Sequence, residues 1–131
     1  MREETEPDWE LCDVCARLLD PLAEARFAVV RDSSAVRVVS ACADGWRLVV
    51  ACGDQHLREL VAAYRARPWI PAELWAGRVE RAWVTAPPAD RLTVEALAAR
   101  TGLSRVQVRA GVWLLRQRLA GRWPPPGLLP A

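Results

Sequence analysis

Hydrophobic positions divide the chain into a strand-rich first half and a helical second half. Runs of β-branched and other apolar residues at 25–30, 35–41 and 46–50 predict three strands. The polar stretch 32–34 and the Asp-Gly pair at 44–45 fall between these runs and predict the turns that join them. The first half is therefore expected to contain a β-hairpin and one extra strand.

Apolar side chains at helical spacing predict four helices after the third strand. The expected ranges are 54–67, 71–84, 94–101 and 104–119. Pro68 ends the first helix, and Thr93 and Ser104 are suitable N-caps for the last two. Strands followed by a run of helices indicate an α+β fold.

Composition limits the class of protein. A chain of 131 residues fits one ordinary domain or two small ones, and a hydrophobic fraction of 52% argues for a folded protein. Every basic residue is arginine, which we attribute to coding bias rather than to function. No apolar run approaches the roughly 20 residues of a membrane span, and the N-terminus lacks the apolar core of a signal peptide. We therefore expect a cytoplasmic protein without a membrane partner, whose thiols stay reduced.

Charge is distributed unevenly along the chain. Residues 1–30 contain eight acids and three arginines, whereas no acid follows Glu95. The charges after Glu95 are Arg100, Arg105, Arg109, Arg116, Arg118 and Arg122. A basic segment of one sign is suited to a polyanion such as DNA. The alternative is a solvated helix face in an arginine-rich protein.

Four residues in two short clusters form a candidate metal site. Cys12 and Cys15 are separated by two residues, so both thiolates can reach one ion. Cys52 and His56, the only histidine, are one helical turn apart and share a helix face. A Cys₃His set is a common closed, tetrahedral arrangement for structural zinc. We predict a structural Zn²⁺ bound by these four side chains.

Several alternatives to this site stay open. Cys42 could replace His56 as the fourth ligand, or the cysteines could be buried thiols while His56 caps a helix. A redox CxxC would lie at a strand-to-helix turn, and no strand is expected before Cys12. A catalytic zinc would need a nearby general base, but Leu57 follows His56. We therefore predict no catalytic residues, no enzymatic activity and no small-molecule substrate.

The first half of the chain resembles a treble-clef zinc finger across residues 9–67. In that family a CxxC knuckle is followed by a β-hairpin and then by a helix that supplies two ligands from its first turn. The resemblance implies that Cys12 and Cys15 form the knuckle pair, and that Cys52 and His56 form the helix pair. The sequence departs from the family in the wider spacing of the helix pair and in the 36-residue gap between the pairs.

The second half resembles a helix-turn-helix module across residues 70–120. The family places a small residue, a glycine and an aliphatic residue around its turn, and Ala98, Gly102 and Leu103 match these positions. Three helices without a β-hairpin wing are expected. The resemblance implies that DNA contacts come mainly from the last helix. Arg105, Gln107 and Arg109 would read bases, Arg100 and Arg116 would contact phosphates, and Trp113 would lie beside them.

Apolar positions also predict which side chains of the helical half are buried. In the last helix the repeat Val108, Val112, Leu115 and Leu119 marks a buried stripe, and Gly111 indicates close packing against a partner element. Seven tryptophans are too many for a small core. We expect Trp46, Trp75 and Trp83 in the core or between modules.

The sequence as a whole predicts a sequence-specific DNA-binding protein, a transcriptional regulator with a structural zinc. The alternative is a non-enzymatic adaptor that uses both modules to hold a protein partner, such as a protein of the transcription machinery. The expected organisation is an acidic disordered tail at 1–8, a zinc module at 9–67, a helix-turn-helix module at 70–120 and a proline-rich tail at 121–131. Target sequence and oligomeric state do not follow from these patterns.

Overall fold

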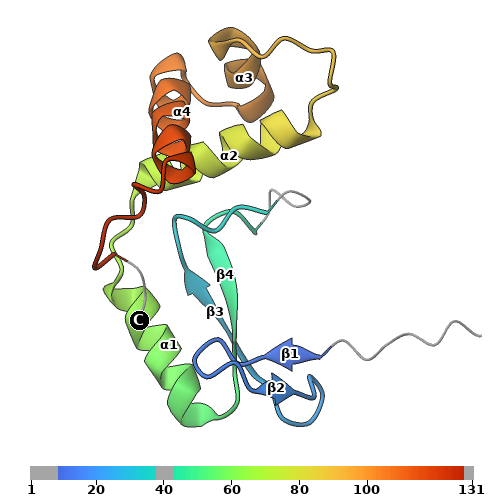
Figure 1. Cartoon of the computed structure of the whole chain (residues 1–131), viewed down its shortest axis with the longest axis vertical. Helices are drawn as coiled ribbons and strands as arrows, with labels where there is room; N and C mark the ends of the chain where they lie inside the picture. The colour runs from blue at the N-terminus through green and yellow to red at the C-terminus, as the bar shows by residue number, and fades with distance from the viewer. Residues whose placement is uncertain (1–8, 38–42, 129–131) are drawn as a thin grey trace, which may run out of the picture. The chain divides into compact units, whose positions relative to one another are not determined.

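The computed structural model describes residues 9–37 and 43–128. These residues form a small α+β fold with two antiparallel hairpins and four helices (Figure 1). The chain is organised as two compact units. The first unit contains residues 1–30 and 48–66, and the second contains residues 31–47 and 67–131. Residues 31–47 therefore group with the helical half, whereas the sequence analysis assigned them to the zinc module.

A short hairpin precedes the strands that the sequence predicts. Strand β1 (Glu10–Leu11) pairs antiparallel with strand β2 (Leu18–Leu19), with Glu10 opposite Leu19 and Leu11 opposite Leu18. The expectation that no strand precedes Cys12 is wrong, since β1 ends at the residue before it. A two-residue strand is too short to show an alternating pattern in the sequence.

The second hairpin pairs strand β3 (Arg26–Arg31) with strand β4 (Trp46–Ala51). The predicted strand at 35–41 is not found at 35–37, and its remaining residues lie outside the described part of the chain. Asp32 instead organises the predicted turn, because its carboxylate accepts hydrogen bonds from the backbone N–H and the hydroxyl of Ser34. Val36 packs on Gly77, because a Cβ added to Gly77 would lie 2.4 Å from Cγ2 of Val36. This packing outweighs the strand preference of the apolar run.

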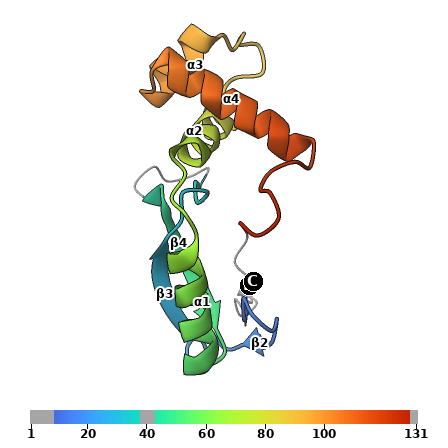
Figure 2. The same cartoon turned by 90° about the vertical axis from the view of Figure 1, so that its left-hand side faces the viewer.

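Helix α1 (Asp54–Ala66) lies along the β3–β4 hairpin in both views of the structure (Figures 1 and 2). It follows β4 after two residues, and Pro68 follows its end as the sequence predicts. The hairpin, the helix and the β1–β2 strands enclose a small core. Its buried members are Cys12, Leu19, Val30, Val49, Val50, Ala51 and Leu60.

The remaining helices begin and end close to their predicted boundaries. They are α2 (Pro71–Thr85), α3 (Val94–Thr101) and α4 (Arg105–Leu119). The Thr93 hydroxyl accepts a hydrogen bond from the N–H of Ala96, which confirms it as an N-cap. Gly102 ends α3 with φ +72°, a left-handed conformation that glycine adopts without a steric penalty.

Helix α4 packs closely on α2 through Gly111. A Cβ at Gly111 would lie 3.0 Å from the backbone nitrogen of Ala76, so only glycine allows this approach without a shift of the backbone. Leu114 is buried on this face, whereas Leu119 is 89% exposed. The predicted burial of Leu119 is therefore wrong. The buried side chains shared by α2, α3 and α4 are Val79, Ala82, Leu97, Leu103 and Val108.

The tryptophan expectations are only partly met. Trp75 packs against the helical core, as predicted. Trp46 is 47% exposed and Trp83 is 63% exposed, so neither is a core side chain. Their burial was predicted wrongly because apolar character alone does not show whether another element of the fold covers a side chain.

A buried carboxylate explains why residues 31–47 belong with the helices. Glu73, in the first turn of α2, is 1% exposed. Its carboxylate accepts hydrogen bonds from the Ser33 hydroxyl at 2.6 Å, from both terminal nitrogens of Arg67 at 2.7 and 2.6 Å, and from the Trp123 indole at 3.0 Å. Asp44 forms a second link, to Arg78 and Arg81 of α2. Polar partners from several segments thus fix the loop on the start of α2.

Candidate metal centre

The knuckle between β1 and β2 carries the first cysteine pair. The N–H of Cys12 bonds the carbonyl of Arg17 at 3.0 Å, and the N–H of Ala16 bonds the carbonyl of Cys12 at 2.8 Å. Ala16 has φ +59°, which allows the chain to reverse tightly after Cys15. This reversal brings both thiols to one side of the turn.

Asp13 docks the knuckle on strand β4. Its backbone N–H bonds the carbonyl of Val50 at 2.8 Å, and its carboxylate accepts the N–H of Val50 at 2.8 Å. Val50 lies two residues before Cys52, so this pair of hydrogen bonds brings the first cysteine pair to the place where β4 leads into α1. The 36-residue gap between the two ligand pairs is closed by this contact.

Cys52 lies in the two-residue link between β4 and α1, and His56 lies in the first turn of α1. The N–H of Leu57 bonds the carbonyl of Gly53, so the first helical turn begins directly after Cys52. The Cys52 thiol is 3.1 Å from Nδ1 of His56, so the two side chains meet although Cys52 precedes the helix that was expected to carry both.

The four side chains converge on one point. The Sγ atoms of Cys12, Cys15 and Cys52 and a ring nitrogen of His56 all lie within 4.8 Å of one another. The Cys15 and Cys52 sulfurs are 3.8 Å apart, and the Cys12 sulfur is 3.6 Å from Nδ1 of His56. Two thiolates at the 2.3 Å Zn–S distance in a tetrahedron would be about 3.8 Å apart. These four residues are close enough to hold a metal ion, and the set is consistent with zinc.

The electrostatics of the cluster favour a thiolate at Cys12. Burial raises the pKa of this thiol, but backbone N–H groups of Cys15 and Val14 and the side chain of His56 outweigh it, and the pKa falls to about 6. The pKa of Cys52 is raised by burial and by its sulfur neighbours Cys15 and Cys12. Negative charge on neighbouring sulfurs is unfavourable at these distances. A bound cation would offset this repulsion and stabilise the thiolates.

Cys42, the alternative fourth ligand, lies outside the described residues. His56 is confirmed as a member of the group that can hold a metal.

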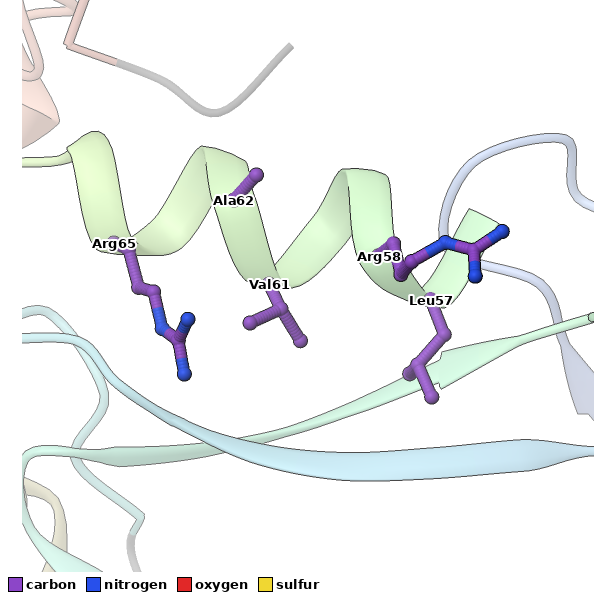
Figure 3. A pocket seen from close by; sticks show the side chains of 5 residues that line it. All are labelled: Leu57, Arg58, Val61, Ala62 and Arg65. Atoms are coloured by element: carbon purple, nitrogen blue, oxygen red, sulfur yellow. The ribbon is translucent and has the colours of Figure 1, made fainter. Parts of the chain in front are cut away.

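A shallow hollow lies on the flank of α1 (Figure 3). Its volume is about 240 Å³, and its lining residues are Leu57, Arg58, Val61, Ala62 and Arg65. Leu57, Val61 and Arg65 extend toward the side of the helix that faces the strands in this view. None of the four metal-site residues lines the hollow, and its lining contains no nucleophile or carboxylate.

Three of the predicted DNA-contacting residues have intramolecular partners. Arg100 forms an ion pair with Asp90, and Arg105 forms one with Glu95 at the start of α3. The Gln107 side chain accepts the N–H of Ser104 at 2.9 Å and completes a capping box at the start of α4. A backbone N–H at the start of α3, together with Arg105 and Arg109, holds the pKa of Glu95 below its usual range.

The other three candidates lie exposed on α4. Arg109, Trp113 and Arg116 are spaced by three and four residues, so they follow one face of the helix. Trp113 is 57% exposed. Within the described residues, no carboxylate lies within ion-pair distance of Arg109 or Arg116.

No known protein family, curated protein or solved structure matches the chain. In residues 9–37 and 43–128, every helix is too short or too polar to cross a bilayer.

Proposed function

We propose that the chain is a non-enzymatic DNA-binding protein in which a structural zinc stabilises the first unit and α4 contacts duplex DNA. The single observation that carries the DNA assignment is the exposed row Arg109, Trp113 and Arg116 on a helix that follows a glycine turn. The proposal has two parts, which depend on different residues and can fail separately.

The zinc assignment is supported by the donor set and its spacing. Cys12 and Cys15 come from a hairpin turn, and Cys52 and His56 come from the start of a helix. This order resembles a treble-clef finger. Zinc would replace the contacts between these side chains with four metal–ligand bonds, and all four positions would be taken by protein. Such a closed site holds a fold together rather than activating water.

The DNA assignment is supported by the local geometry around Gly102. Thr93 and Ser104 cap the two helices that flank this left-handed glycine, and α4 rests on α2. The arrangement resembles a helix-turn-helix module, in which the second helix of the motif enters the major groove. In our proposal Arg109 contacts base edges, Arg116 contacts a phosphate, and Trp113 packs against the sugar–phosphate backbone.

In our proposal Gln107 and Arg105 have roles other than the base reading that the sequence suggests, whereas Arg100 keeps its phosphate contact. Gln107 is engaged in the capping box, so we assign it to the helix start rather than to base reading. Arg105 and Arg100 would reach phosphates only after exchanging their carboxylate partners, Glu95 and Asp90. Because both ion pairs are solvent-exposed, this exchange requires little free energy.

Titration of labelled duplex pools with the full chain at two salt concentrations tests the assignment. The Arg109→Ala variant should bind a selected sequence about five- to 100-fold more weakly and lose preference at one base pair. Arg116→Ala should weaken all sequences alike and reduce the salt dependence by about one phosphate contact. Arg58→Ala, on α1, is the matched control. Absence of duplex binding by the wild type in low salt would refute the proposal.

The adaptor alternative is favoured by apolar exposure on the same helix. Val106 is 75% exposed, Leu119 is 89% exposed and Trp113 is 57% exposed. Val106 and Trp113 are seven residues apart and share one face of α4, and exposed apolar side chains on a helix face are typical of protein interfaces. A partner that binds through them should be lost in Val106→Ser and retained in Arg116→Ala, which is the opposite of the result expected for DNA.

A further inference from the structure

Two exposed indoles and a guanidinium form a cluster in the second unit, which we call the Trp–Arg–Trp cluster. The guanidinium carbon of Arg31 lies 4.5 Å from the centre of a Trp69 ring and 5.7 Å from that of Trp46. Trp46 is 47% exposed and Trp69 is 41% exposed. Neither the metal site nor the exposed row on α4 includes these residues.

Gly45 fixes the place of Trp69. An added Cβ at Gly45 would lie 2.7 Å from Cη2 of Trp69, so the indole rests directly on the glycine. Gly45 has φ +84°, and its N–H and carbonyl bond the carbonyl of Ala35 and the N–H of Asp32 at 2.8 and 2.9 Å. The cluster is thus built on a hydrogen-bonded turn, which lowers the entropy that a ligand would have to remove.

The exposed charge around the cluster is positive. The two acids of residues 31–47, Asp32 and Asp44, have nearly buried side chains, and both are paired with arginines. In the part of the chain that the structure describes, Arg31 has no carboxylate within ion-pair distance. Residues 38–42 contain no charged side chain. The cluster therefore presents a cation between aromatic rings, with both nearby carboxylates neutralised.

We propose that the Trp–Arg–Trp cluster binds the unpaired bases of single-stranded nucleic acid. A base can stack on an exposed indole surface, and the guanidinium of Arg31 can neutralise the neighbouring phosphate. Stacking of this kind accepts any base because every base has a flat π-face. An acidic peptide would use the charge of Arg31 but would leave the indole surfaces without a matching ring. The proposal does not depend on duplex binding by α4.

Fluorescence anisotropy with the full zinc-loaded chain tests this site. The probes are labelled oligothymidine and oligouridine of about 15 nucleotides, with a blunt duplex of equal length in parallel. Trp46→Ala should weaken binding of the single strands about tenfold or more, and Arg31→Gln should weaken it and reduce its salt dependence. Trp83→Ala removes a more exposed indole from α2 and should leave binding within twofold.

Two further controls test whether each variant folds and whether the single strand binds at this cluster rather than on α4. Because Trp69→Ala could disturb the turn, Trp69→Phe is used there, and the thermal melting of each variant is compared with that of the wild type. Failure of the wild type to bind either single strand in low salt would overturn the proposal, as would equal losses for Trp46→Ala and Trp83→Ala. Loss of single-strand binding in a joint Arg109→Ala and Arg116→Ala variant would assign it to α4 and would also overturn it. DNA and RNA probes distinguish the two sources of unpaired bases.

Discussion

The carboxylate and the backbone N–H of Asp13 both bond the backbone of Val50, each at 2.8 Å. Asp13 lies between the knuckle cysteines, and Val50 lies two residues before Cys52. The two contacts therefore hold the two residue pairs of the candidate metal centre close together, although Asp13 and Val50 are not members of the cluster.

Removing this carboxylate should weaken metal binding. Asp13→Ala leaves the N–H of Val50 without its partner and loosens the knuckle, so we expect a roughly 10- to 100-fold loss of zinc affinity. Competition with a chromophoric chelator measures this. Glu59→Gln, an exposed change on α1, is the control. Equal affinity of Asp13→Ala and wild type would show that the cysteines alone set the register.

Loss of the metal should unfold the first unit selectively. We expect Cys52→Ser, or a strong chelator, to remove zinc and to destroy the order of β1, β2 and α1, because that unit has a small core. Elemental analysis together with hydrogen exchange resolves the two units. The helices after Pro71 should keep their protection, and Cys42→Ser should keep its zinc. Loss of zinc in Cys42→Ser would identify Cys42 as the fourth ligand.

Gly111→Ala tests the contact between α4 and α2. An alanine in an open helix would add about 1 kcal/mol of stability relative to glycine. Here the new methyl group would lie 3.0 Å from the backbone of α2, so we expect a loss of about 1–3 kcal/mol in the free energy of unfolding. Urea denaturation measures it, with Gln117→Ala on the same helix as the control. A stabilised Gly111→Ala protein would contradict the close approach.

The second unit should lose stability in acid. Burial raises the pKa of Glu73, but hydrogen bonds from Arg67, Ser33 and Trp123 outweigh it and hold the pKa below the ordinary value of 4.5. The pKa of Asp44 is likewise lowered by Arg81 and Arg78. A lowered pKa in the folded state contributes stability that is present above the ordinary value and is lost as the pH falls through the folded value.

The expected pH profile follows from that sign. The free energy of unfolding of the wild type should decline below about pH 4.5. Glu73→Gln should be less stable than the wild type at neutral pH and should show a shallower decline. Denaturant melts of both proteins across this range check the profile. Parallel profiles would mean that Glu73 is not the titrating group.

Glu95 forms an ion pair with Arg105 of α4, and its removal should strengthen DNA binding. Glu95→Gln frees Arg105 from its ion pair and removes a charge that repels phosphate. Since exposed pairs contribute little, we expect a gain of about two- to fivefold in duplex affinity. The same anisotropy titration measures it, with Glu59→Gln as the control. Weaker binding would argue that Arg105 does not reach the DNA.

Local chemistry made the metal cluster and the helices predictable. Cys12, Cys15, Cys52 and His56 come together as their spacing predicts, and the caps at Thr93 and Ser104 follow from short-range hydrogen bonds. Each ligand pair and each cap depends on residues that are close together in the sequence, whereas the two ligand pairs are brought together by the contact of Asp13 with Val50. The four helices were therefore found with boundaries within one or two residues.

The wrong structural predictions concern residues whose positions are set by contacts with distant parts of the chain. The pattern 35–41 predicted a strand, but Val36 is drawn into a contact with Gly77. Leu119 fitted an apolar stripe, but it is the last residue of α4 and is exposed, whereas Gly111 packs on α2. Asp13 was overlooked because nothing in a CxxC spacing shows that its interior carboxylate bonds another strand. Each error concerns a tertiary contact that one sequence does not reveal.

The carboxylate of Glu73 joins four stretches of the chain at one buried point, including Trp123 beyond the last helix. No single cut of the polypeptide can release the helical section with this point intact, because Ser33 is contributed from before α1. A fragment that begins at Pro71 would keep Glu73 but lose Arg67 and Ser33, so the first turn of α2 would lose two of the three partners of this carboxylate. Truncation studies should therefore keep residues 9–123 together, because residues 48–66 share a core with Cys12, Leu19 and Val30, and a helical fragment that binds poorly would report damaged folding rather than a missing contact.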